Sequence, residues 1–238
     1  MSERREPGIP ASSERGPSGP AAEPPRAEDM EIAVLVFDRI TALDAIGPYE
    51  VLSRLPDAQL RWVGSEPGPV RTDKGLATFV VEATLADVAR ADVLVVPGGF
   101  GTRALIEEPV VLDWVRAIHE TTTWTTSVCT GSLVLAAAGL LDGVDATTHW
   151  AARGLLAELG ANPVPERVVE RGKIVTAAGV SSGIDMALTL AARIAGDDVA
   201  RAIQLGIEYD PQPPFDAGSL EKAPPEIVEL VRSVELTR

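Results

Sequence analysis

From Glu31 onward, runs of consecutive apolar residues alternate with segments in which apolar residues recur at helical spacing. Short apolar runs are typical of strands that are buried on both faces, as in a parallel sheet. The predicted strands are 32–37, 60–64, 92–99, 123–128, 145–148, 167–169 and 174–177, with 77–83 as an outlying strand or hairpin arm. The predicted helices are 43–55, 110–119, 131–138, 151–159, 181–195, 198–208 and 226–234. This alternation predicts an α/β fold with a mainly parallel central sheet and helices on both faces.

The first predicted helix contains Gly47 and Pro48 close to its start. Proline is tolerated in the first turn of a helix, because its missing N–H group would have no partner there. We therefore expect this helix to begin close to Ile46.

The first 29 residues differ from the rest of the chain in composition. They are rich in proline, serine, glutamate and arginine and contain almost no large apolar residue. Such a segment buries too little apolar surface to offset the entropy lost on folding, so we expect residues 1–29 to be disordered. Met30 directly precedes the first apolar run, and residues 30–238 are expected to form a single domain.

Composition and charge exclude several classes of function. Hydrophobic residues make up 45% of the chain and charged residues 24%, as in ordinary soluble proteins. No apolar run is long enough to cross a bilayer and the N-terminus lacks the apolar core of a signal peptide, so a cytoplasmic location without a membrane partner is expected. The formal net charge of −14 disfavours nucleic acid as a partner. One cysteine and two histidines are too few for a thiolate or histidine-rich metal site, so no such site is expected. A metal held by carboxylates stays open, although no spacing of carboxylates indicates one.

The single cysteine, Cys129, stands between the apolar run 123–128 and a helical stretch that starts at Gly131. Only a sharp strand-to-helix turn joins such elements directly, and the small residues Thr130, Gly131 and Ser132 allow the backbone to come close. This is the pattern of a nucleophile elbow, with cysteine in place of serine. The N–H groups and dipole of the helix N-terminus favour the thiolate, so we predict a reactive nucleophile. A small buried hydrophobic residue is the alternative interpretation.

The segment VVPGGFGT, residues 95–102, ends another predicted strand at the same edge of the sheet. Ligands bind at the carboxyl ends of strands in open α/β folds. The backbone N–H groups of Gly98 and Gly99 are therefore candidates for an oxyanion hole, although glycine pairs also end strands simply to form a turn. The segment matches neither a P-loop nor the GxGxxG pattern of dinucleotide-binding proteins.

Two further side chains are candidates for proton transfer. Asp44 follows the first predicted strand and is expected at the same edge, either as a helix cap or as a carboxyl group beside the sulfur. Away from water, such a carboxyl group has a raised pKa and donates or shuttles a proton near neutral pH. His149 is a possible base, but a structural role explains it equally well.

These motifs, in this order, resemble the DJ-1/PfpI (ThiJ) superfamily over nearly all of residues 31–220. The resemblance implies a flavodoxin-like, class I glutamine amidotransferase-like sandwich. Many PfpI-like members have histidine directly after the cysteine, whereas this chain has Thr130, which argues against a Cys-His protease. The stretches LDAIGPYEVL, SVCTGSLVLAAAGLL, ATTHWA, SSGIDMALTLAA and IEYDPQPPFDAGS are similar to the isocyanide hydratase branch.

The resemblance to this branch implies hydration of an organic isocyanide to an N-substituted formamide through a thioimidate on Cys129. It further implies that Asp44 donates the proton, that Thr130 holds water or the thiolate, and that Gly98 and Gly99 stabilise negative charge. No cofactor is needed, and a homodimer acting on a small molecule is expected.

Other functions stay open at this stage. The same cysteine suits a glyoxalase III-like hydratase or deglycase acting on α-oxoaldehydes. A redox-sensor or chaperone role of the DJ-1 type rests on oxidation of Cys129. Related domains also occur as sensing halves of AraC-type regulators, but the roughly 20 residues after Ser219 are too few for a helix-turn-helix domain.

Overall fold

A computed structural model describes residues 30–235 of the protein. The predicted disordered segment, residues 1–29, lies outside this range, as do residues 236–238. No helix within the described range is both long and apolar enough to span a bilayer.

The core of the molecule is a seven-stranded sheet with the order β10-β11-β7-β6-β1-β2-β5. Its strands are β1 (Met30–Leu35), β2 (Ala58–Gly64), β5 (Ala83–Thr84), β6 (Val93–Val96), β7 (Trp124–Val128), β10 (Val168–Arg171) and β11 (Ile174–Ala177). All neighbouring pairs are parallel except β10 and β11. The central strands are buried on both faces, as their apolar runs predicted. The predicted α/β fold with a mainly parallel sheet is confirmed.

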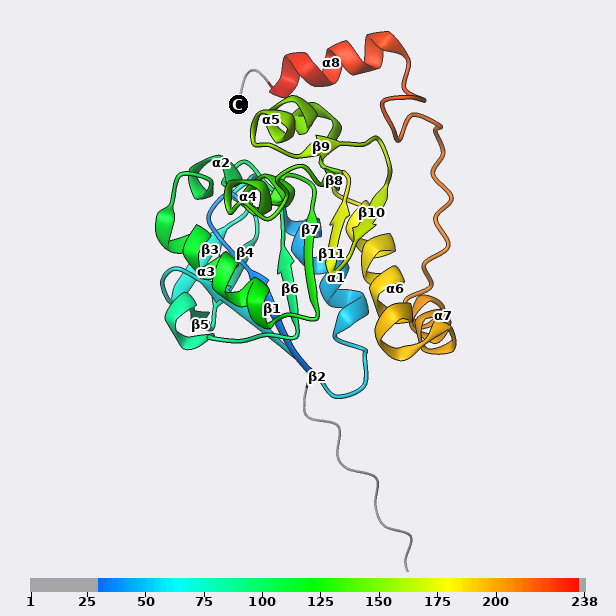
Figure 1. The fold of residues 1–238 in the computed structure, drawn as a ribbon. Coiled ribbons are helices and arrows are strands. Elements are labelled where there is room, and N and C mark those ends of the chain that lie inside the picture. The colour runs from blue at the N-terminus through cyan, green and yellow to red at the C-terminus, as the bar shows by residue number, and fades with distance from the viewer. Residues whose placement is uncertain (1–29, 236–238) are drawn as a thin grey trace, which may run out of the picture.

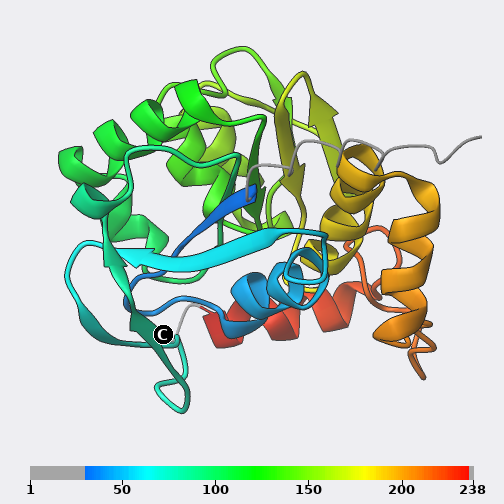
Figure 2. The same cartoon turned by 90° about the horizontal axis from the view of Figure 1, so that it is seen from below.

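Helices cover both faces of the sheet (Figures 1 and 2). They are α1 (Ala42–Leu52), α2 (Thr102–Leu105), α3 (Pro109–Thr121), α4 (Gly131–Ala137), α5 (Arg153–Glu158), α6 (Ser182–Ala195), α7 (Asp197–Gly206) and α8 (Pro225–Glu235). Helices α1 and α6 pack together on one face, and α3 and α4 lie on the other. Short 3-10 helices occupy Leu85–Asp87 and Trp150–Ala152.

Two small sheets lie outside the central one. The predicted hairpin arm is β4 (Thr78–Val81), which pairs antiparallel with β3 (Gly68–Arg71), a strand that the sequence pattern did not reveal. Strands β8 (Asp145–Ala146) and β9 (Asn162–Pro163) form a parallel pair. The predicted strand 145–148 is therefore only partly correct.

The predicted start of the first helix is wrong, because α1 begins at Ala42 and contains Pro48 in its interior. Tertiary packing overrides the local preference here. A Cβ atom on Gly47 would lie 3.1 Å from Cγ1 of Ile184 on α6, so α1 and α6 approach closely at this glycine. The early start places Asp44 in the first turn of the helix, directly after β1.

The C-terminal segment leaves the body of the domain. From the end of α7, an extended stretch runs along the side of the molecule to α8, which lies at the opposite end near α5 (Figure 1). An ion pair of 3.3 Å between Arg153 and Glu221 ties this segment to the start of α5. On α8, Ile227, Leu230 and Val231 are exposed.

Candidate active site

The carboxyl ends of β7 and β11 hold the backbone of Cys129 in a sharp turn. Cys129 has a φ of +56°, which is uncommon for a residue with a side chain and is typical of a nucleophile elbow. Its N–H group donates to the carbonyl groups of Ala177 at 3.0 Å and Ala178 at 2.8 Å. Its own carbonyl oxygen accepts from the hydroxyl groups of Ser132 at 3.2 Å and Thr148 at 2.9 Å. The elbow predicted from the sequence is present, and it is fixed from both sides.

Gly131 allows this turn to form. A Cβ atom at this position would lie 1.9 Å from the carbonyl oxygen of Val96, at the end of the neighbouring strand β6. No other amino acid has a side chain small enough for this approach. The small residues that follow Cys129 therefore have the packing role that the sequence suggested.

Asp44 is fully buried next to the elbow. Its Oδ2 accepts the N–H group of Gly98 at 3.0 Å, whereas its Oδ1 is buried without a hydrogen-bond partner among the described residues. The carboxyl group also interacts with the Cys129 thiol. Burial raises the pKa of Asp44 to about 7, and the hydrogen bond from Gly98 only partly opposes this rise. The raised pKa agrees with the proton-shuttling role predicted from the sequence.

The expected thiolate character of Cys129 is not supported, because the pKa of its thiol is raised. Burial is the largest cause, and the negative charge of Asp44 acts in the same direction. The N–H groups of Val180 and Thr130 point at the sulfur and lower its pKa, as a helix N-terminus should, but they do not compensate for burial. The free protein therefore holds a neutral thiol beside a carboxyl group that titrates near neutral pH.

The glycine turn after β6 holds the side chains of the site. While Gly98 donates its N–H group to Asp44, Gly99 donates to Oγ1 of Thr130 at 2.9 Å. The Thr130 hydroxyl in turn donates to the carbonyl oxygen of Gly99 at 3.2 Å and lies 3.1 Å from the hydroxyl of Thr102. The two N–H groups expected to form an oxyanion hole are thus occupied by Asp44 and Thr130. In this structure they position the two side chains.

Gly98 also makes a close approach that a larger residue would prevent. A Cβ atom there would lie 2.6 Å from the nitrogen of Thr130 and 2.7 Å from Oδ2 of Asp44. The absence of a side chain at Gly98 therefore lets both the carboxyl group and the elbow pack closely against this residue.

A cavity of about 200 Å³, here called the inner cavity, opens onto this site. Its lining residues are Thr41, Asp73, Lys74, Gly99, Phe100, Arg103, Cys129, Thr130, His149, Ala151, Ala152 and Val180. His149 is therefore near the site, and its ring packs so closely on Gly179 that a Cβ there would lie 2.9 Å from Cδ2. Its Nδ1 accepts the N–H group of Ala151 at 3.4 Å, and we assign His149 no step in the chemistry.

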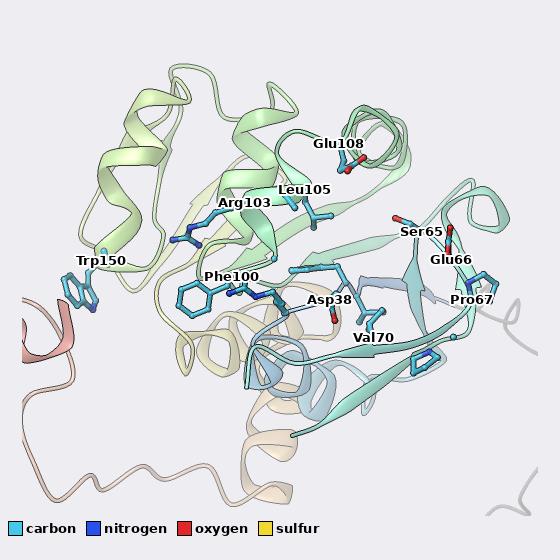
Figure 3. Close-up of a pocket in the computed structure, with 18 of the residues that line it drawn as sticks. Asp38, Ser65, Glu66, Pro67, Val70, Phe100, Arg103, Leu105, Glu108 and Trp150 are labelled. Atoms are coloured by element: carbon cyan, nitrogen blue, oxygen red, sulfur yellow. The ribbon is translucent and has the colours of Figure 1, made fainter. Parts of the chain in front are cut away.

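A second cavity of about 1350 Å³, here called the outer cavity, shares lining residues with the inner one. Figure 3 shows the outer cavity. Phe100, Arg103 and Ala151 line both cavities. The outer cavity extends from Trp150 past Phe100 to Ser65 and its neighbours on the loop before the β3–β4 hairpin.

Sequence reasoning missed several residues around these cavities. One of them is Val180, whose N–H group points at the sulfur of Cys129. Val180 follows β11, which was predicted as a strand, so its position at the carboxyl edge of the parallel sheet could have identified it. Phe100 and Arg103 lie within and just after the glycine turn that the sequence singled out. Arg39 gave no signal, because its place beside Phe100 depends on the fold.

Within residues 30–235, no group of His, Cys, Asp and Glu side chains is arranged to bind a metal ion. The groups in direct contact at the elbow are the Cys129 thiol, the Asp44 carboxyl group, the Thr130 hydroxyl and backbone N–H groups.

Comparisons with known proteins identify the family of the chain. The model of the DJ-1/PfpI family matches residues 30–193. The chain is 46% identical to isonitrile hydratase from Pseudomonas putida over 203 residues, which cover 85% of this chain and 89% of that protein. A ThiJ/PfpI family protein from Pseudomonas syringae superposes with a TM-score of 0.82 at 36% identity, covering 90% of this chain and 95% of the other. DJ-1beta from Drosophila melanogaster, at 23% identity and a TM-score of 0.70, covering 77% of this chain and all of the other, shares the fold. The chain therefore belongs to the DJ-1/PfpI family.

Proposed function

We propose that the protein hydrates an organic isocyanide, R–NC, to the N-substituted formamide, R–NH–CHO, with Cys129 as the nucleophile. The observation that carries this proposal is the burial of the Asp44 carboxyl group beside the Cys129 thiol, with Cys129 itself at the wall of the inner cavity. The similarity to a Pseudomonas isonitrile hydratase supports the same reaction.

In the first step, the sulfur of Cys129 attacks the terminal carbon of the isocyanide, and an S–C bond forms. Asp44 accepts the thiol proton and passes it to the same carbon, which gives a neutral thioimidate, R–N=CH–S–Cys129. A carboxyl group with a pKa of about 7 suits this task, because it exchanges protons readily in both directions near neutral pH. The neutral thiol of the free protein is activated only as the reaction proceeds.

In the second step, a water molecule adds to the thioimidate carbon. Asp44 takes one proton from this water and transfers it to the nitrogen, so that a tetrahedral intermediate with a hydroxyl group forms. The C–S bond then breaks, the formamide leaves, and the hydroxyl proton returns to the pair of Cys129 and Asp44. One water molecule is consumed, and the thiol is regenerated.

The surrounding groups position this pair. Gly98 orients Asp44, and Gly99 orients Thr130 at the wall of the inner cavity. The N–H groups of Val180 and Thr130 point at the sulfur and stabilise negative charge as it develops there. We infer that these two groups, rather than the N–H groups of Gly98 and Gly99, provide the electrostatic stabilisation.

The test is turnover of p-nitrophenyl isocyanide and of methylglyoxal by the purified protein. The proposal expects formamide from the isocyanide, no turnover by Cys129→Ala and little by Cys129→Ser. Ser127→Ala is a matched control, because Ser127 lies on β7, two residues before Cys129, with a buried hydroxyl that makes no hydrogen bond among the described residues. This control should retain activity. A rate with methylglyoxal alone would replace this proposal with action on α-oxoaldehydes.

We further infer a single-domain cytoplasmic protein that forms a homodimer, as the family resemblance implies. The exposed apolar residues Leu43 and Ile46 on α1 are consistent with a surface that a second copy covers. Light scattering coupled to size-exclusion chromatography tests this, and a monomer at micromolar concentration contradicts it.

A further inference from the structure

The arginines of this acidic protein divide into two groups. Nine of the thirteen arginines between residues 30 and 235 form an ion pair with a carboxylate. The four that form none in this range are Arg39, Arg71, Arg103 and Arg232. All of them except Arg71 line the outer cavity. Arg71 donates instead to the carbonyl oxygen of Gly75 at 3.2 Å.

Two of these arginines share one aromatic ring. The guanidinium carbons of Arg39 and Arg103 lie 5.5 Å and 5.4 Å from the ring centroid of Phe100. A cation–π contact orients a guanidinium group but does not neutralise its charge. Two like charges at one ring repel each other, and an anion between them would remove this repulsion.

The backbone holds Arg39 in an unusual conformation. Its φ is +61°, in the left-handed region that residues with side chains seldom occupy. The N–H group of Arg39 donates to the carbonyl oxygen of Arg71 at 2.7 Å, and its carbonyl oxygen accepts from Gly101 at 3.2 Å. These two bonds connect the β3–β4 hairpin to the turn that carries Phe100. Such strain is typical of functional positions.

The outer cavity also contains carboxylates, which lie apart from these arginines. Asp38, Glu66 and Glu108 also line it, but none of them forms an ion pair with Arg39 or Arg103. Figure 3 shows Arg103 and Phe100 toward Trp150, with Glu66 on the far side of the cavity.

Arg103 connects this cationic region to the chemistry, because it lines the inner cavity as well. The only other cationic side chain on the inner wall within the described residues is Lys74, which lies next to Asp73. Because Cys129, Phe100 and Arg103 line the same cavity, a molecule with its reactive carbon at Cys129 shares that cavity with the Arg103 side chain. Guanidinium groups bind carboxylates with two parallel hydrogen bonds, which a neutral substituent cannot accept.

We propose that Arg103 and Arg39 bind an anionic group of the substrate, so that the preferred substrates are isocyanides that carry a carboxylate. This inference rests on the proposed function and deepens it by naming the substrate class. The two arginines are specificity-determining residues and take no part in proton transfer.

The test compares kcat/KM for 4-isocyanobenzoate and for phenyl isocyanide, which differ by the carboxylate. The wild-type protein should prefer the charged substrate by about tenfold or more, and 0.5 M NaCl should reduce this preference. Arg103→Gln should lower the ratio of kcat/KM for 4-isocyanobenzoate to kcat/KM for phenyl isocyanide about tenfold, and Arg39→Gln should lower this ratio less. Arg201→Gln, which removes an equal charge from α7, should leave the ratio unchanged.

A wild-type ratio near one, or a ratio that neither Arg103→Gln nor Arg39→Gln lowers, overturns the inference while the hydratase function stands. If neither isocyanide is hydrated, the proposed function fails, and the anion site is then tested by calorimetric titration with benzoate. Saturable binding that Arg103→Gln weakens supports the site, whereas no binding to the wild-type protein overturns it.

Discussion

The inner and outer cavities share a wall, yet they are built in different ways. At the inner cavity, Thr130 and the adjoining buried Asp44 are fixed by backbone N–H groups of one glycine turn, and Cys129 is fixed by strand ends. At the outer cavity, Arg39 and Arg103 are exposed side chains that lie over one aromatic ring and form no ion pair within the described chain.

This difference separates reactivity from selectivity. Buried groups held by the backbone have shifted pKa values and little freedom, which suits bond making at a fixed point. Exposed arginines on long side chains adapt to different ligands and contribute charge at modest energetic cost. Changes at the inner cavity should therefore abolish turnover, whereas changes at the outer cavity should alter which substrate is preferred.

The largest expected effect on the inner cavity, short of losing the nucleophile, comes from Asp44→Asn. Asparagine keeps the shape of the side chain and still accepts the Gly98 N–H group, but it cannot shuttle a proton. We expect kcat/KM for p-nitrophenyl isocyanide to fall by about 10²–10⁴-fold, measured by steady-state formamide production. Retention of more than half the activity would remove Asp44 from the mechanism.

A smaller loss is expected from Gly98→Ala. The added methyl group would lie 2.7 Å from Oδ2 of Asp44 and must displace it or the elbow. Misplacement by about 1 Å costs on the order of 10²-fold in rate. Gly154→Ala is the matched control, since a Cβ atom there on α5 meets no atom within 4 Å. Equal activity of the two variants would show that the close approach at Gly98 is unimportant.

The buried carboxyl group also predicts how stability depends on pH. The pKa of Asp44 is about 7 in the folded protein, against 3.8 for the ordinary side chain. Between these two pH values Asp44 is protonated in the folded state and ionised in the unfolded state. The stability that Asp44 contributes is therefore greatest at low pH and is lost as pH rises through 7. From pH 5 to pH 8 the free energy of unfolding should fall by about 3 kcal/mol more in the wild-type protein than in Asp44→Asn. Urea unfolding of both proteins measures this difference, and parallel curves would contradict the raised pKa.

Much of the inner cavity could be predicted from the sequence, because its key positions follow buried strands. The residue after a strand of a parallel sheet lies at the carboxyl edge, whatever the rest of the fold does. This rule located Asp44 after β1, Gly98 after β6 and Cys129 after β7. Gly131 was also recognisable, since a tight strand-to-helix turn requires a small residue.

The roles of these groups were harder to predict, because they depend on burial and on hydrogen-bond partners. A helix N-terminus near Cys129 suggested a low pKa, but burial outweighs it in the fold. The Gly98 and Gly99 amides were expected to face the substrate, but they are occupied by side chains. Arg39 and Phe100 are separated by 61 positions in sequence, and only the packing of two loops brings them together.

The central claim is that Cys129 forms a covalent bond to the isocyanide carbon during turnover. Rapid acid quenching of the wild-type protein with excess p-nitrophenyl isocyanide, followed by peptide mass spectrometry, tests it directly. The account predicts a transient mass increase of one isocyanide on the peptide that contains Cys129, decaying as the formamide forms. Formation of the formamide while this peptide stays unmodified at every time point would contradict it.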